Sequence, residues 1–173
     1  MKLLRCGPPG EEVPAVLDRA GTVRDLSGYI DDVAGNALLP RSLASLKSID
    51  WDALPLIKGE PRIGPCVGYV GKIIGVGLNY RDHAVESNMP VPSEPPLFLK
   101  PSSSIIGPND DVEIPRGSDK TDWEVELGVV IGMPAKYVSA EEALNHVAGY
   151  CVVNDVLSTV TKGSIDRNSG FVS

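Results

Sequence analysis

The chain is poor in the residues that would build a zinc site or a disulfide framework. Its 173 residues include only 3 cysteines and 2 histidines. Cys6, Cys66 and Cys151 are widely scattered, and no Cys-x-x-Cys pair or paired histidines occur. Zinc is therefore not expected, because structural zinc sites use closely spaced Cys and His ligands. Scattered cysteines fit a reducing cytoplasm better than a secreted, disulfide-stabilised domain.

Positive charge and long apolar runs are also scarce. The chain has 16 Lys and Arg residues against 23 Asp and Glu residues, with a net charge of −7 and a pI near 4.8. This balance argues against nucleic-acid and anionic-membrane partners, because both call for basic patches. No segment approaches the ~18 apolar residues of a membrane span, and the amino terminus lacks the apolar run of a signal peptide. We therefore expect a cytoplasmic protein.

Two carboxylates lie close together in an apolar segment, residues 122–132. Its alternating apolar residues, many of them β-branched, predict a strand that enters a core. Side chains alternate along a strand, so Glu124 and Glu126 point to one face while Val125 and Leu127 point to the other. Neighbouring carboxylates repel each other unless a cation lies between them. The pattern indicates a metal site, although two unrelated surface glutamates would look the same.

A third carboxylate follows another apolar run. Residues 147–153 are apolar and rich in β-formers, and Asn154 and Asp155 come directly after them. We expect Asp155 to lie where this buried strand ends and meets solvent. Three carboxylates without a Cys or His cluster form an all-oxygen site suited to Mg²⁺, Mn²⁺ or Ca²⁺. Asp155 alone would equally fit a helix N-cap or a turn.

A possible catalytic pair follows a glycine-rich turn. Residues 72–77 predict a short strand that runs into this turn, and the polar segment after it could open a helix. His83 and Glu86 are three residues apart and would share one face of that helix. A histidine oriented by a carboxylate is a common general base, whereas an ordinary surface pair has the same spacing. No third glycine completes a dinucleotide-binding fingerprint, which argues against a Rossmann site.

Five segments, in order and at similar spacing, resemble the fumarylacetoacetate hydrolase family. They are Gly-Leu-Asn-Tyr-Arg-Asp-His-Ala-x-Glu (77–86), Pro-Leu-Phe-Leu-Lys-Pro-Ser-Ser-Ser (96–104), Gly-Pro-Asn-Asp (107–110), Asp-Trp-Glu-Val-Glu-Leu-Gly-Val-Val-Ile-Gly (122–132) and Val-Ala-Gly-Tyr-Cys-Val-Val-Asn-Asp-Val (147–156). The amino-terminal part resembles the branch labelled ureidoglycolate lyase or 2,4-diketo-3-deoxy-sugar-acid hydrolase.

The resemblance implies a metal site and a catalytic dyad. Glu124, Glu126 and Asp155 match the three metal-binding carboxylates of the family. His83 and Glu86 match the dyad that activates water or abstracts a proton. A bound Mg²⁺ or Mn²⁺, with Ca²⁺ as a further possibility, would polarise substrate oxygens while His83 handles the proton.

The resemblance also implies a substrate class. Lys100 matches a lysine whose charge suits an anionic substrate, and Tyr80 and Arg81 are expected substrate contacts. The implied function is a metal-dependent hydrolase or lyase that acts on a small oxo- or hydroxy-acid of the ureidoglycolate or acylpyruvate (diketo acid) type. The resemblance further implies a homodimer.

The expected fold is α+β and mostly β. A small amino-terminal αβ domain is expected over residues 1–68, with short strands at 1–5, 13–18 and 22–25 and a helix around 42–47. An incomplete mixed β-roll core follows over residues 69–156. Within it, Ser139 is expected to cap a short helix.

Residues 157–173 diverge from the family and are expected to be a tail. The chain thus resembles a family member shortened on its carboxy-terminal side. Two function classes remain, an oxo-acid hydrolase or lyase and a non-catalytic remnant or gene-model artefact of such an enzyme. A structural Ca²⁺-binding module is a weaker third, because no EF-hand-like Asp spacing occurs.

Overall fold

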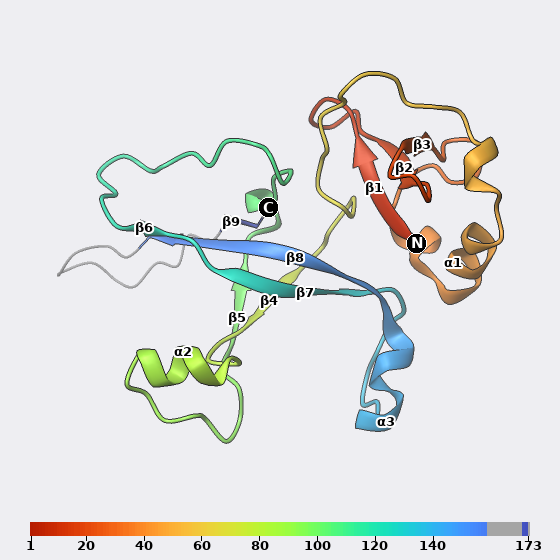
Figure 1. The fold of residues 1–173 in the computed structure, drawn as a ribbon. Helices are drawn as coiled ribbons and strands as arrows, with labels where there is room; N and C mark the ends of the chain where they lie inside the picture. Colours follow the sequence, from red (N-terminus) through yellow and green to blue (C-terminus); the bar gives the residue numbers. More distant parts are fainter. Residues whose placement is uncertain (159–170, 173) are drawn as a thin grey trace.

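The structure is a computed structural model that describes residues 1–158 and 171–172. We call residues 1–68, with β1 to η2, the amino-terminal unit, and the described residues after them the sheet unit (Figure 1). Among the described residues, no helix is both long and apolar enough to cross a membrane.

The amino-terminal unit is a three-stranded antiparallel sheet with a short helix. Its strands are β1 (Lys2–Cys6), β2 (Val13–Leu17) and β3 (Val23–Asp25), paired in that order. The helix α1 (Pro40–Lys47) begins with a proline in its first turn, where the missing N–H costs no helical hydrogen bond. Two 3₁₀ turns, η1 (Gly35–Leu38) and η2 (Trp51–Ala53), flank α1. The predicted strands and helix are confirmed to within about two residues.

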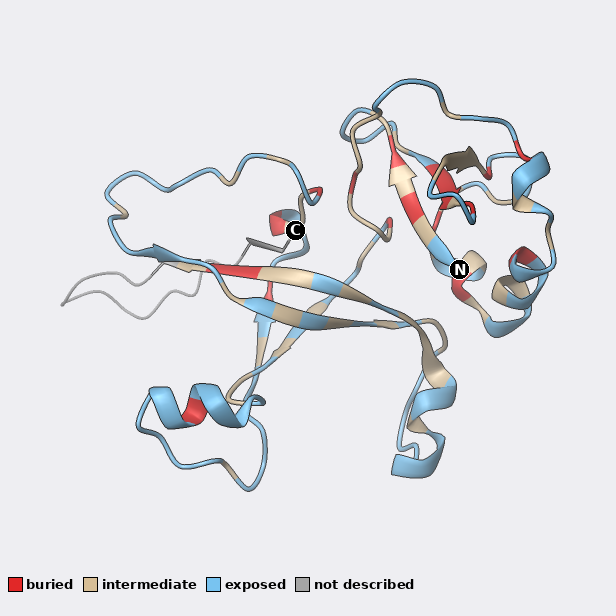
Figure 2. Cartoon of the chain, in the orientation of Figure 1, coloured by how far each residue is buried: buried red, intermediate tan, exposed pale blue. Residues whose placement is uncertain are grey.

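Most buried apolar side chains belong to this amino-terminal unit. One cluster joins Val16 of β2 to Leu46 of α1, together with Leu26 and Leu54. A second cluster contains Leu4, Cys6 and Ala15. Figure 2 shows the buried residues gathered there, with few in the sheet unit. The unit therefore has a small core of its own.

The sheet unit consists of a hairpin-like pair and a longer sheet. Strands β4 (Ile73–Val76) and β5 (Leu97–Lys100) pair antiparallel, and helix α2 (Arg81–Glu86) lies between them in sequence. The 3₁₀ turn η3 (Ser102–Ser104) follows β5.

In the longer sheet, one strand carries all the pairing. Strand β8 (Val147–Ser158) pairs antiparallel with β6 (Thr121–Asp122), β7 (Val125–Ile131) and β9 (Phe171–Val172). A short helix α3 (Ala140–Ala143) and the 3₁₀ turn η4 (Leu144–His146) connect β7 to β8. The hydroxyl of Ser139 accepts a hydrogen bond from the N–H of Glu142, so the predicted cap is confirmed.

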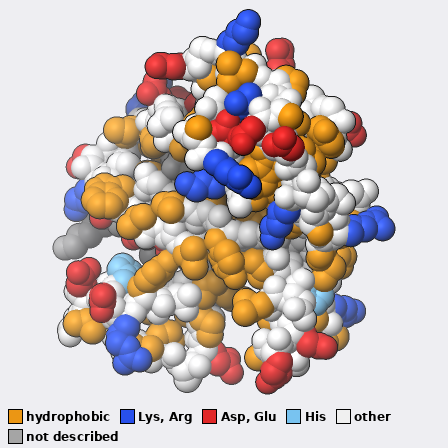
Figure 3. All heavy atoms as spheres, turned by 45° about the vertical axis from the view of Figure 1, so that its right-hand side comes forward, with side chains coloured by type: hydrophobic (Ala, Val, Ile, Leu, Met, Phe, Trp, Pro, Cys, Tyr) orange, Lys and Arg blue, Asp and Glu red, His pale blue; other side chains and the backbone are white. Residues whose placement is uncertain are grey.

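The apolar face of β7 does not enter a core, which corrects the sequence prediction. Val125, Leu127, Val129 and Ile131 alternate along one face and are 49–65% exposed. The facing side chain of Val152 in β8 is 74% exposed. Figure 3 shows that apolar side chains form much of the visible surface. The predicted alternation is thus present, but no described residue covers this face.

The environment of Asp155 also differs from the prediction. Strand β8 continues through Asp155 to Ser158, so Asp155 is neither a helix N-cap nor a turn residue. It is buried rather than placed at the solvent boundary. The expected tail boundary after Val156 lies inside this strand, because Leu157 still pairs with Asp122 of β6. The expectations for residues 159–170 and 173 lie outside the described residues.

Candidate metal centre

The register of the sheet brings three carboxylates to one face. Strands β6 and β7 pair with β8 in one continuous register, which places Glu124 opposite Asp155. The N–H of Asp155 donates to the carbonyl of Glu124 over 2.7 Å. Residues directly opposite each other in an antiparallel pair point to the same face. Glu126, two residues beyond Glu124, shares that face because side chains alternate.

Glu124, Glu126 and Asp155 form an acidic triad. Each offers a carboxylate oxygen, and the three oxygens lie within 4.8 Å of one another. Asp155 is buried, whereas the two glutamates are half-buried. Their proximity follows from the register. The sequence argument anticipated it for the two glutamates, while Asp155 joins them from within a strand and not from its end.

Electrostatic strain in the triad is visible at Glu126. Burial raises the pKa of its carboxyl group, and the negative charges of Asp155 and Glu124 raise it further. The positive charges of Lys100 and His83 act in the opposite direction. Like charges this close disfavour full ionisation unless a cation compensates them. The triad is therefore a group of hard oxygen donors whose negative charge is only partly compensated by nearby positive groups.

Lys100 supplies the one positive charge in direct contact with the triad among the described residues. It lies at the end of β5, is 6% exposed, and its ammonium group forms an ion pair with Oδ1 of Asp155. The Nζ atom also lies 5.6 Å from the centroid of the Phe98 ring. The lysine reaches the site as the resemblance implies, but its partner here is an aspartate.

A glycine in β4 allows the aromatic ring beside Lys100. Gly75 pairs with Phe98 across the β4–β5 ladder. A Cβ atom at Gly75 would lie 2.2 Å from the Phe98 ring, so a larger residue would displace the ring. Phe98 and Lys100 are two apart on β5 and share its inward face. The sequence analysis did not predict Phe98 as a site residue. Its spacing of two residues from Lys100 on a strand could have shown that the two side chains share a face.

A cavity of about 360 Å³ opens beside the triad. Its walls come from the β4–α2 turn, from β5 and from the β7–β8 pair. The predicted site residues that line it are Tyr80, His83, Lys100, Glu124, Glu126 and Asp155. Residues 76–79 and Phe98, Val125 and Leu157 complete the lining. The volume is that of a small-molecule site.

The two members of the predicted dyad are placed differently. His83 lines the cavity, and its positive charge acts to lower the pKa of Glu126. Glu86 is exposed on α2 and does not line the cavity. Within the described residues, no ion pair joins His83 to Glu86 at 4.0 Å or less. The structure therefore brings the histidine, but not its proposed orienting carboxylate, to the acidic triad.

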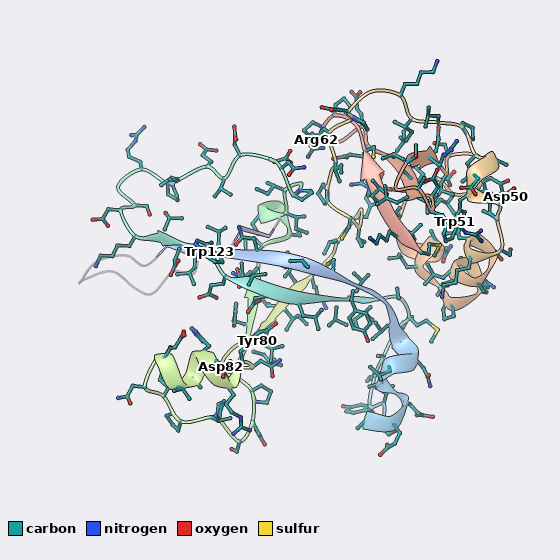
Figure 4. The ribbon with its side chains drawn as sticks, in the orientation of Figure 1. Asp50, Trp51, Arg62, Tyr80, Asp82 and Trp123 are labelled. Atoms are coloured by element: carbon teal, nitrogen blue, oxygen red, sulfur yellow. The ribbon has the colours of Figure 1, made fainter. Side chains whose placement is uncertain are left out.

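Tyr80 connects α2 to the strand that carries Glu126. Its hydroxyl oxygen accepts a hydrogen bond of 2.9 Å from the N–H of Leu127 in β7. The O–H group stays available as a donor beside the cavity. Figure 4 shows Tyr80 between α2 and the strands. Arg81, the next residue, is exposed and does not line the cavity.

The fold and site together define a mostly β α+β protein with an acidic cavity that could hold a hard cation. Residues 72–162 match the family described as Fumarylacetoacetate (FAA) hydrolase C-terminal. The chain belongs to this family.

The relatives are longer than this chain. A protein of Burkholderia cenocepacia, named as a candidate hydrolase, is 59% identical over 175 residues, which cover 99% of this chain and 62% of the relative. A relative from Burkholderia multivorans is 58% identical with the same coverage. The chain thus spans about 62% of the length of the curated relatives that it matches.

Solved structures agree on the fold. A fumarylacetoacetate hydrolase from psychrophilic Exiguobacterium antarcticum matches with a TM-score of 0.69 and 30% identity over 91% of this chain and 56% of its own. A 5-carboxymethyl-2-hydroxymuconate delta-isomerase from Mycobacterium smegmatis matches with a TM-score of 0.61 and 26% identity over 91% of this chain and 55% of its own. The fold is therefore like part of larger family members.

Proposed function

We propose that this chain carries the cation- and substrate-binding part of a metal-dependent hydrolase or lyase for small oxo- or hydroxy-acids. The supporting observation is the meeting of the acidic triad with His83 and Lys100 around one cavity of about 360 Å³. A cytoplasmic location, which the sequence favours, and a homodimer, which the family resemblance implies, are part of the same proposal.

The acidic triad is the proposed ligand set for Mg²⁺ or Mn²⁺, with Ca²⁺ as a further possibility. Its donors are all carboxylate oxygens, which suit hard divalent cations. A bound cation would supply Lewis-acid polarisation of the substrate oxygens. Protonation of Glu126 competes with cation binding, and the pKa of Glu126 is raised. Cation affinity should therefore fall as the pH is lowered through that raised pKa.

The other cavity residues have complementary proposed roles. His83 takes or gives a proton as the general base, which requires only that it face the substrate. Lys100 attracts the carboxylate of an anionic substrate, and the Tyr80 hydroxyl donates a hydrogen bond to it. Glu86 is the proposed orienter of His83, and Arg81 is a proposed substrate contact, although neither lines the cavity.

The names of the solved relatives support the substrate class. One acts on fumarylacetoacetate and another on a 5-carboxymethyl-2-hydroxymuconate. Both compounds are organic acids with an oxo or hydroxyl group, which a cation and Lys100 could bind together. We therefore propose an acylpyruvate, a related diketo acid or ureidoglycolate as the substrate.

A non-catalytic remnant is the alternative. The exposed apolar face of β7 favours it. The two proposals differ in what happens when the chain is extended, because only a functional site would become active.

The decisive assay uses a chimera in which this chain is continued by the unmatched part of the Burkholderia cenocepacia relative. We expect turnover of at least one acid in a panel of acylpyruvates, diketo acids and ureidoglycolate with Mg²⁺ or Mn²⁺, and loss of turnover with a chelator. The matched control is the same chimera with Glu124→Gln and Glu126→Gln, which keeps the side-chain shapes. A folded chimera without turnover on the whole panel would contradict the proposed function.

A further inference from the structure

The fold brings two of the three cysteines into contact. Cys66 lies in the segment before β4, and Cys151 lies in the middle of β8. They are far apart in sequence, yet their thiols hydrogen-bond to each other. Both thiols are free and half-buried, whereas Cys6 is buried in the amino-terminal core. The proposed function uses neither thiol of the pair.

The sheet holds Cys151 in place through its pairing with β7. Cys151 lies opposite Gly128 in the β7–β8 ladder. A Cβ atom at Gly128 would lie 2.6 Å from the Cys151 sulfur, so the thiol occupies the space above this glycine. Its side chain therefore shares the face of the acidic triad, because Gly128 is two residues beyond Glu126.

The amino-terminal unit holds Cys66 from both sides. The N–H of Gly64 donates to the carbonyl of Arg5 over 2.8 Å, and the N–H of Gly68 donates to the carbonyl of Val33 over 3.0 Å. These two bonds fix the short loop that carries Cys66 to the first unit. A bond between the two cysteines would thus join two separately anchored elements.

The two thiols differ in reactivity. The hydrogen bond with Cys151 and, more weakly, the charge of Arg5 lower the pKa of the Cys66 thiol to about 7. The same contact and burial raise the pKa of Cys151. The thiolate is the form that reacts with oxidants, so Cys66 is the attacking group near neutral pH.

We propose that Cys66 and Cys151 are a site of reversible oxidation, at which a peroxide converts the thiol pair into a disulfide between the amino-terminal unit and β8. The Cys66 thiolate attacks a peroxide oxygen, the O–O bond breaks, and Cys66 becomes a sulfenic acid as hydroxide leaves. The hydroxide takes up the proton that Cys66 released on ionising, which gives the first water. The Cys151 thiol then attacks the Cys66 sulfur, the S–S bond forms and a second water leaves. The pair loses two electrons and hydrogen peroxide gains them.

The disulfide would reinforce an interface that already has non-covalent links. Arg62, close to Cys66 in sequence, pairs with Asp110 of the sheet unit over 2.5 Å. Gly132 at the end of β7 packs so close to the Leu38 carbonyl that an added Cβ would lie 2.5 Å from it. Cross-links that close long loops stabilise a fold by restricting the unfolded chain. In the chimera that continues this chain, we expect the melting temperature to rise by about 5–15 °C on oxidation.

The test is to oxidise the reduced chain, at low protein concentration, with a stoichiometric amount of hydrogen peroxide. We expect the loss of two hydrogens in the intact mass, a Cys66–Cys151 cross-linked peptide in the digest, and full reversal by a thiol reductant. Cys6→Ala is the matched control and should give the same cross-link. If that variant does not fold, the wild-type digest still identifies the pair.

Two single variants test the assigned order of attack. With Cys151→Ser, Cys66 should still oxidise, and a sulfenic-acid trap such as dimedone should label it. With Cys66→Ser, the labelling of Cys151 should be at least about tenfold slower, because burial still raises the pKa of its thiol after the contact with Cys66 is lost. A cross-link through Cys6, cross-links only between molecules, or no thiol loss at all would overturn the proposal.

Discussion

Replacing His83 by alanine is expected to lower kcat by about 10²–10⁴-fold in the chimera that continues this chain. The imidazole is the proposed general base, and it lines the cavity that holds the acidic triad. Losing it removes proton transfer without removing a carboxylate. Mn²⁺ affinity should therefore barely change. Steady-state kinetics and a Mn²⁺ titration on the same preparation measure both quantities.

The other histidine provides the matched control for this measurement. His146 lies in η4, outside the residues that line the cavity. His146→Ala should therefore keep the turnover of any chimera that stays folded. Glu86→Gln should cost less than His83→Ala, because Glu86 is exposed and lies outside the cavity. Full turnover in His83→Ala would assign the proton transfer to another group.

A polypeptide of these 173 residues on its own is expected to be at least about 10³-fold less active than the chimera. The apolar side chains on one face of β7 are 49–65% exposed, and Leu97 and Leu99 of β5 are 67% and 72% exposed. Exposed apolar faces and unpaired strand edges promote association. Water near an open triad also weakens the electrostatic stabilisation on which such catalysis depends.

Size-exclusion chromatography with light scattering, a thermal melt and the oxo-acid panel test this expectation together. We expect heterogeneous oligomers, a broad melt and turnover near background, with the chimera measured in parallel as the reference. A monodisperse, cooperatively melting polypeptide with turnover close to that of the chimera would contradict it. In that case these 173 residues would suffice for the site.

The acidic triad shows which parts of the site a local sequence pattern can predict. Strand alternation places Glu124 and Glu126 on one face, and this needs no knowledge of the rest of the fold. The position of Asp155 depends on the register between β7 and β8. The sequence of either strand alone does not determine how two distant strands pair. The apolar run before Asp155 suggested a strand end there, whereas β8 continues to Ser158.

Burial and long-range contacts were harder to predict. The predicted alternation in β7 is confirmed. Alternation alone does not determine which face of a strand is buried, and here the apolar face is exposed. His83 and Glu86 share a helical face by spacing, yet only His83 faces the cavity, because the direction of α2 is set by tertiary contacts such as the Tyr80 hydrogen bond to β7. The contact between Cys66 and Cys151 likewise depends on how the two units meet.

The central claim is that the acidic triad binds a hard divalent cation, and a calorimetric titration with Mn²⁺ tests it most directly. In the chimera that continues this chain, the wild-type triad should bind one Mn²⁺ per chain at neutral pH. Glu126→Gln, which keeps the shape of the side chain and removes its charge, should bind at least about tenfold more weakly. Equal affinity in the two proteins, or no binding by a folded wild-type chimera, would contradict the account.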